Sequence, residues 1–150
     1  MILFLDIDGV LHSNTATQET AFCNRHHLWR LLLAFSNMKV VISSDWRIST
    51  SLEELNDLIM NGSAPSLKER IISITPVMSE FKYDFGNREK ECLAWLDQNN
   101  QTNWLAIDDV IENFEINSKN VYITNFKTGL TSEDVDVLIK KIKKLNYIEK

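Results

Sequence analysis

The first ten residues constrain the fold of this chain more than any other segment. Four apolar residues, 2–5, lead directly into two carboxylates, Asp6 and Asp8, and then into Gly9. A short apolar run of this kind predicts a buried strand, so Asp6 would stand at the strand end, on the rim of a sheet. That rim is where open α/β sheets carry their ligand sites. Because glycine permits a sharp turn, Asp6 and Asp8 can converge on one pocket.

The same arrangement recurs later in the chain. Lys39 to Ser43 and Asn103 to Ile107 are further buried runs, and the second one ends on another acidic pair, Asp108 and Asp109. Strands that alternate with helices predict parallel pairing through right-handed crossovers. We therefore expect a three-layer α/β/α sandwich around a central, mainly parallel sheet. The remaining predicted strands are 70–74 and 121–124, and the predicted helices are 15–37, 51–60, 86–99 and 131–145.

Length and composition limit the organisation of the molecule. The 150 residues, 44% hydrophobic and 25% charged, are expected to form a single domain, residues 1–150. No apolar run could span a bilayer, and the early acids interrupt any leader pattern, so we predict a cytoplasmic protein without a membrane partner. Cys23 and Cys92 lie in segments of helical pattern, and we interpret them as buried apolar groups. Nothing in the sequence predicts the oligomeric state.

The charge balance restricts the partners. Sixteen basic and 21 acidic residues give a formal net charge of −5, which argues against indiscriminate binding to long nucleic acid. A nucleic-acid end stays open as a substrate. The histidines at 12, 26 and 27 predict no metal site. His12 follows the acidic loop, and lining the entrance of the site is one alternative for it.

Four short features follow one another at predicted strand ends or helix starts. They are Asp6-Ile7-Asp8-Gly9, then Ser43-Ser44, then Arg88 or Lys90, then Asp108-Asp109. In this order they resemble the motifs of the haloacid dehalogenase (HAD) superfamily, over about residues 1–130. More narrowly, the chain is similar to the small capless HAD domain of Swiss Army Knife RNA repair proteins in the stretches 43–47, 88–91, 104–109 and 128–131.

The resemblance implies a role for each acid. Asp6 would be the nucleophile that forms an aspartyl-phosphate, and Asp8 would be the general acid that protonates the leaving oxygen and then activates water. A cation must offset the repulsion between a carboxylate and a phosphate dianion, and Mg²⁺ prefers oxygen ligands. The implied ligands are Asp6, the backbone carbonyl of Asp8, and the late pair Asp108 and Asp109.

A hydroxyl and a cation would hold the phosphate. Ser43 would donate a hydrogen bond to a phosphate oxygen, with Ser44 as the alternate, because adjacent strand residues face opposite ways. Arg88 would neutralise charge on the phosphoryl group and keep Asp6 ionised, with Lys90 as the alternate.

The rest of the substrate would meet Trp46 and Arg47. Trp46 offers an aromatic face for a base or sugar, and Arg47 a cation for a second phosphate, although simple packing of Trp46 is an equal alternative. The intervals 8–39 and 44–88 are too short for an inserted cap domain. An open site of this kind favours a large substrate.

The sequence thus predicts a magnesium-dependent phosphomonoesterase acting on a phosphorylated substrate, with a nucleic-acid end, a phosphoprotein or a glycan as candidates. One alternative is a phosphatase for small metabolites. Another is a catalytically weak or partner-dependent binding or scaffold module of the same fold, although all four catalytic positions are filled. A receiver-type signalling domain disagrees with the order of the features, because its phosphorylated acid lies mid-chain and its lysine late.

Overall fold

A computed structural model describes residues 1–78 and 84–148, and it describes side chains up to Leu145. The elements in chain order are β1 (Ile2–Leu5), α1 (Arg25–Ala34), β2 (Lys39–Ile42), α2 (Trp46–Ser49), α3 (Leu52–Met60), η1 (Pro65–Leu67), β3 (Ile71–Ile74), α4 (Asn87–Gln98), β4 (Trp104–Asp108), η2 (Ile111–Asn113), β5 (Val121–Ile123) and α5 (Ser132–Ile148).

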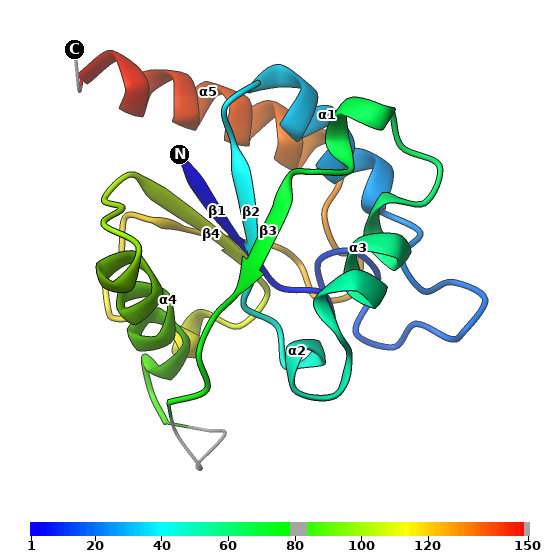
Figure 1. Cartoon of the computed structure of the whole chain (residues 1–150), viewed down its shortest axis with the longest axis horizontal. Coiled ribbons are helices and arrows are strands. Elements are labelled where there is room, and N and C mark those ends of the chain that lie inside the picture. Colours follow the sequence, from blue (N-terminus) through cyan, green and yellow to red (C-terminus); the bar gives the residue numbers. More distant parts are fainter. Residues whose placement is uncertain (79–83, 149–150) are drawn as a thin grey trace.

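The strands form one five-stranded sheet in the order β3-β2-β1-β4-β5, and every pairing is parallel. β1 is central, with Leu5 opposite Ile42 of β2 on one side and Ile107 of β4 on the other. After β3 the chain crosses back over β1 to form β4, so the strand order reverses beside β1 (Figure 1). Ligand sites of open parallel sheets lie at such a reversal, beyond the carboxyl ends of the strands. The predicted fold class is confirmed.

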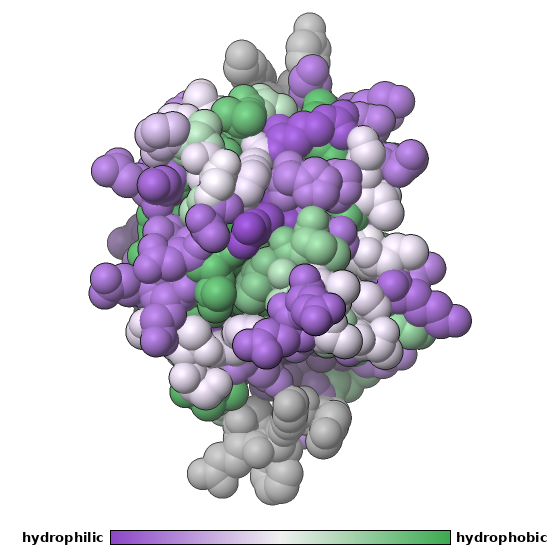
Figure 2. All heavy atoms as spheres, turned by 90° about the vertical axis from the view of Figure 1, so that its right-hand side faces the viewer, coloured by the Kyte–Doolittle hydropathy of each residue, from purple (hydrophilic) through white to green (hydrophobic). Residues whose placement is uncertain are grey.

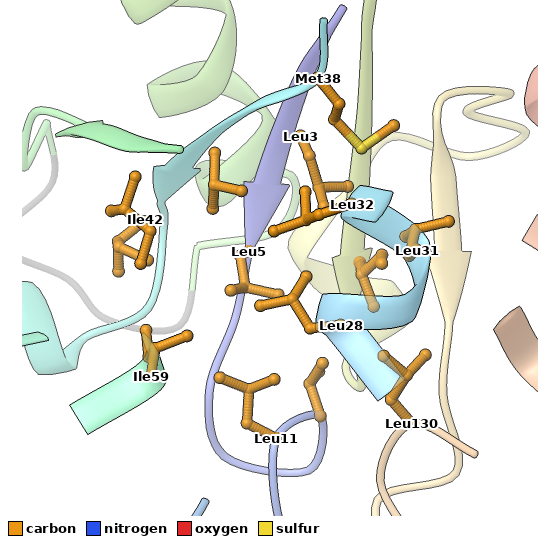
Figure 3. Close-up of a cluster of buried hydrophobic side chains, with 14 of the residues drawn as sticks. Leu3, Leu5, Leu11, Leu28, Leu31, Leu32, Met38, Ile42, Ile59 and Leu130 are labelled. Carbon is orange, nitrogen blue, oxygen red and sulfur yellow. The ribbon is translucent and has the colours of Figure 1, made fainter. Parts of the chain in front are cut away.

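Side chains of β1 alternate between two apolar layers. Leu3 and Leu5 pack with α1, α3 and α5, whereas Ile2 and Phe4 pack with α4. Figure 3 shows the first layer, in which Leu28 and Leu32 of α1 point toward Leu5 and Leu3 of the central strand. Because the alternation continues past the end of the strand, Asp6 follows Phe4 on the α4 side of the sheet. The core thereby fixes the direction of the first acid.

One predicted helix is much shorter than expected. The segment 15–37 contains α1 only from Arg25 to Ala34, and turns occupy most of the residues before it. Phe22 has a backbone φ of 60°, which no α-helix accommodates, and its buried ring packs against the rings of His12 and Trp46. Cys23 lies in this turn region and is exposed, so its interpretation as a buried group is wrong, whereas Cys92 in α4 is buried.

The other predicted elements match closely, and two helices begin at reciprocal caps. Ser51 precedes α3 and exchanges hydrogen bonds with Glu54, while Thr131 and Asp134 do the same at the start of α5. The short helix α2 was not predicted, because four residues are too few to show an apolar periodicity.

The described residues include no inserted cap. The chain between Asp8 and Lys39 forms turns and α1, and residues 44–78 and 84–88 form short elements and their connections. No helix within the described ranges combines the length and the apolar character that crossing a membrane requires. Figure 2 shows a face on which hydrophilic side chains border a small apolar area.

Candidate active site

A cavity of about 260 Å³ opens at the carboxyl ends of β1, β2 and β4. Polar groups from four separate stretches of the chain line it, which agrees with the position that the sheet topology indicates. The lining residues are Asp6, Asp8, Ser44, Asp45, Arg88, Asp109, Val110 and Asn113.

Arg88, at the start of α4, joins the two acidic strand ends. Its Nη1 lies 2.9 Å from Asp6 Oδ1 and 2.9 Å from Asp108 Oδ2, and its Nη2 lies 3.3 Å from Asp45 Oδ1. Burial alone would lower the pKa of Arg88, but the carboxylates of Asp6 and Asp108 outweigh it and raise that pKa further above its ordinary value. The guanidinium is therefore a permanent positive charge between the nucleophile candidate and the late acidic pair.

Asp6, Asp108 and Asp109 form a compact set of oxygen donors. One carboxylate oxygen from each lies within 4.8 Å of the others. Gly9 makes room for this set, since a Cβ at its position would lie 2.1 Å from Asp109 Oδ2, and its φ is +72°. Hard oxygen donors without nitrogen or sulfur ligands fit Mg²⁺.

Crowding of these acids changes how tightly they hold protons. Burial, together with the charge of Asp6, raises the pKa of Asp108 to about 6, although Arg88 acts in the opposite direction. Burial and the charges of Asp6 and Asp108 raise the pKa of Asp109 to about 7. A single guanidinium does not balance three neighbouring carboxylates, so a further cation would relieve their repulsion.

Asp8 also lines the cavity, and its carboxylate is held by two aromatic rings. His12 Nε2 lies 2.7 Å from Asp8 Oδ1, and Trp46 Nε1 donates to Asp8 Oδ2 at 3.1 Å. The Asp8 side chain is nevertheless 60% exposed, whereas that of His12 is 3% exposed. Trp46 thus contacts the acid itself, and it is absent from the cavity wall.

The alternates for the phosphate ligands differ in their position relative to the cavity. Ser44 lines the cavity and Ser43 does not, although both are buried. β2 ends at Ile42, so strand alternation no longer governs the two serines where the chain turns into α2. Arg88 lines the cavity, whereas Lys90 is exposed and lies outside it, because residues two apart on a helix point in nearly opposite directions.

Arg47 does not reach the cavity and has a different environment from the one predicted. The side chain is 2% exposed, and Glu91, also buried, accepts a hydrogen bond from its Nη2 at 2.7 Å. The guanidinium is therefore engaged inside the protein, and the prediction that it meets a second phosphate of the substrate has no support from this position. Its other hydrogen bonds go to the backbone carbonyls of Ser43, Ser44, Thr75 and Pro76.

Sequence reasoning missed the contacts that three residues make in the site, although it had His12 as a candidate for the site's entrance. Asp45 pairs with Arg88, Asn113 donates to Asp108 Oδ1 at 3.3 Å, and His12 contacts Asp8. His12 carries the best signal, because it follows Asp8 by four residues within the same acidic loop. No sequence signal pointed to Asn113, because its contact with Asp108 depends on the turn that η2 forms.

A parallel sheet with an acid after the central strand, a buried cation at a helix start and a late acidic pair defines a domain of the HAD type. The chain belongs to the family described as the HAD domain in Swiss Army Knife RNA repair proteins, whose model matches residues 2–135. This membership supports a HAD-type hydrolase, and HAD domains generally use Mg²⁺. Neither a curated protein nor a solved structure matches the chain.

Proposed function

We propose that this protein is a magnesium-dependent phosphomonoesterase that works through an aspartyl-phosphate on Asp6. One observation carries the proposal: Asp6 is held by Arg88 at 2.9 Å and shares a cluster of carboxylate oxygens with Asp108 and Asp109. Such a carboxylate is fixed in direction, paired with a permanent cation and adjacent to oxygen donors for a divalent ion.

In the first step a carboxylate oxygen of Asp6 attacks phosphorus, and the bond between phosphorus and the leaving oxygen breaks. Asp8 gives its proton to that oxygen, so that a neutral alcohol departs. Asp8 then takes a proton from water, which attacks the phosphorus and releases inorganic phosphate and free Asp6. Ser44 and Arg88 face the cavity and would hold the phosphoryl oxygens throughout.

Magnesium, held by Asp6, Asp108, Asp109 and the backbone carbonyl of Asp8, would supply positive charge that offsets the repulsion between phosphate and carboxylate. The raised pKa values of Asp108 and Asp109 support this assignment, because burial first, and then the charge of Asp6, makes their ionised forms costly without a further cation.

The exposure of the site supports a large substrate. The Asp8 side chain is 60% exposed, and the described residues place no cap over it. The family's name associates related domains with RNA repair, so we propose a phosphorylated nucleic-acid end as the first substrate class to test. The domain's net charge of −5 favours recognition of an end over binding along a strand.

The test is phosphate release from a panel of phosphomonoesters with Mg²⁺ or with EDTA. The panel contains an aryl phosphate, nucleotides, small sugar phosphates, and oligonucleotides with a 5′- or a 3′-phosphate. Release that requires Mg²⁺ and disappears in Asp6→Asn would support the phosphatase, and preference for oligonucleotides would support the nucleic-acid end. Preference for small phosphates would favour the metabolite alternative, and no release from any member would contradict the proposal.

A further inference from the structure

The carboxylate of Asp8 is held by two unlike hydrogen bonds. Oδ1 lies 2.7 Å from Nε2 of the buried His12, and Oδ2 accepts a longer bond of 3.1 Å from Trp46 Nε1. The shorter bond lies on the protein side of Asp8, and the longer one involves a partly exposed indole. The two oxygens are therefore not equivalent before any substrate arrives.

The main chain decides which nitrogen of His12 carries the hydrogen. The backbone N–H of Phe22 lies 3.0 Å from His12 Nδ1, and a backbone N–H can only donate. Nδ1 must then be the acceptor, so in the neutral ring Nε2 carries the hydrogen and donates it to Asp8 Oδ1. His12 cannot pass a proton through its ring while Nδ1 is occupied, which excludes a relay and leaves an orienting role.

Phe22 adopts an uncommon backbone conformation that makes this contact. Its φ of 60° lies in the left-handed region, which is unusual for a bulky residue, and its ring is 4% exposed. The ring meets those of His12 and Trp46 edge to face, at centroid distances of 5.3 Å and 5.2 Å. Three rings thus form one packed cluster behind the Asp8 carboxylate.

We infer that His12 is a positioning residue, which fixes Asp8 Oδ1 and leaves Oδ2 as the oxygen that exchanges a proton with the leaving group and with water. The inference rests on the proposed function. Oδ2 accepts only the longer hydrogen bond, from the partly exposed indole of Trp46, so it is the less tightly held of the two oxygens. Rotation of the carboxylate would turn Oδ2 away, and His12 prevents that rotation.

If His12 only fills space, its replacement should change the rates for different substrates in another way than if it orients Asp8. Alkyl phosphates need their leaving oxygen protonated, whereas an aryl phosphate with an acidic phenol departs with little help. Loss of the His12 donor should therefore slow the first step for an alkyl phosphate much more than for p-nitrophenyl phosphate. Loss of packing alone would slow both equally.

The experiment measures single-turnover release of the leaving group from both substrates in the presence of Mg²⁺. His12→Phe keeps an aromatic ring without a donor, and His12→Gln keeps a donor and an acceptor on the same side chain. Phe22→Leu is the control, because it thins the ring cluster but removes neither donor to Asp8. For the alkyl phosphate we expect a loss of about a hundredfold in His12→Phe, with KM nearly unchanged. His12→Gln should recover most of the rate, and the control should affect both substrates alike.

A second readout does not depend on turnover. Long-range ¹H–¹⁵N NMR of the wild-type protein at neutral pH should show His12 with hydrogen on Nε2, and this hydrogen should exchange with water faster in Asp8→Ala. If the wild-type protein released nothing, the proposed function would fail, and this NMR result would still decide whether His12 holds Asp8. The inference would be overturned if NMR placed the hydrogen of His12 on Nδ1. It would also be overturned if His12→Phe lowered the rates for both substrates equally.

Discussion

The two walls of the cavity hold their carboxylates by opposite means. On the α4 wall, Asp6 and Asp108 share the buried guanidinium of Arg88, with Asp109 beside them. On the α2 wall, the exposed carboxylate of Asp8 accepts hydrogen bonds from the neutral rings of His12 and Trp46. The first wall is dense in charge and buried, and the second is aromatic and open.

The difference corresponds to two chemical tasks. A nucleophile must stay ionised and fixed, and charge pairing in a buried place achieves both. A general acid and base must gain and lose a proton in each cycle, which a neutral donor permits and a neighbouring guanidinium would oppose. The walls therefore predict that substitutions on the α4 wall affect metal binding, stability and chemistry together, whereas those on the α2 wall affect chemistry alone.

The largest expected effect is that of Asp6→Asn. The amide keeps the shape of the side chain but cannot attack phosphorus, so turnover should fall by about a thousandfold or more, equivalent to ~4 kcal/mol in the barrier. Phosphate release with Mg²⁺ measures this directly. Full activity in the purified variant would remove Asp6 from the role of nucleophile.

Asp8→Asn should lower turnover by roughly a hundredfold to ten-thousandfold, the usual contribution of general acid and base catalysis. Mg²⁺ affinity should hardly change, because only the backbone carbonyl of Asp8 is expected to contact the ion. Calorimetric titration with Mg²⁺ tests this, with Asp109→Asn as the matched variant on the other wall, where affinity should fall. Equal weakening of Mg²⁺ binding in both variants would erase the contrast between the walls.

Arg88→Gln should lower the free energy of unfolding by about 3–5 kcal/mol in the absence of metal, because breaking a buried ion pair leaves carboxylates without a partner. Lys90→Gln is the control, since Lys90 is exposed and outside the cavity, and it should change stability by no more than about 0.5 kcal/mol. Urea denaturation with EDTA gives both values. A similar small loss in the two variants would mean that Arg88 does not hold the acids.

The smallest expected effect is a pH dependence of stabilisation by Mg²⁺. The folded protein raises the pKa of Asp108 to about 6 and that of Asp109 to about 7, above the ordinary value of 3.8. Between the ordinary value and these raised values, the folded protein binds more protons than the unfolded chain. The two carboxyl groups therefore favour folding at low pH, and this contribution is lost as the pH rises through 6 to 7. Mg²⁺ binds the ionised carboxylates and should raise the melting temperature by a few degrees more at about pH 8 than at about pH 5. Asp109→Asn should shrink that difference, and an equal shift at both pH values would argue against these ligands.

The sequence predicted the α4 wall better than the α2 wall, for a physical reason. Asp6 directly follows one buried strand and Asp108 ends another, so local apolar patterning places both of them at the sheet rim. The environment of Asp8 depends on His12, which accepts a hydrogen bond from the backbone N–H of Phe22. Phe22 lies in a turn, whereas the apolar spacing of the sequence predicted a helix there. The burial of Arg47 likewise depends on Glu91, 44 residues away, and on loop carbonyls that no periodicity reveals.

The most direct test of the central claim is identification of the phosphorylated residue. Asp8→Asn should accumulate the intermediate, because it lacks the base that deprotonates water. The variant is mixed with Mg²⁺ and p-nitrophenyl phosphate, quenched in acid, treated with borohydride, which reduces an acyl phosphate to an alcohol, and analysed by peptide mass spectrometry. The account predicts conversion of residue 6 from aspartate to homoserine, and none in the double variant with Asp6→Asn. Reduction at another carboxylate, or at none while phosphate is released, would contradict it.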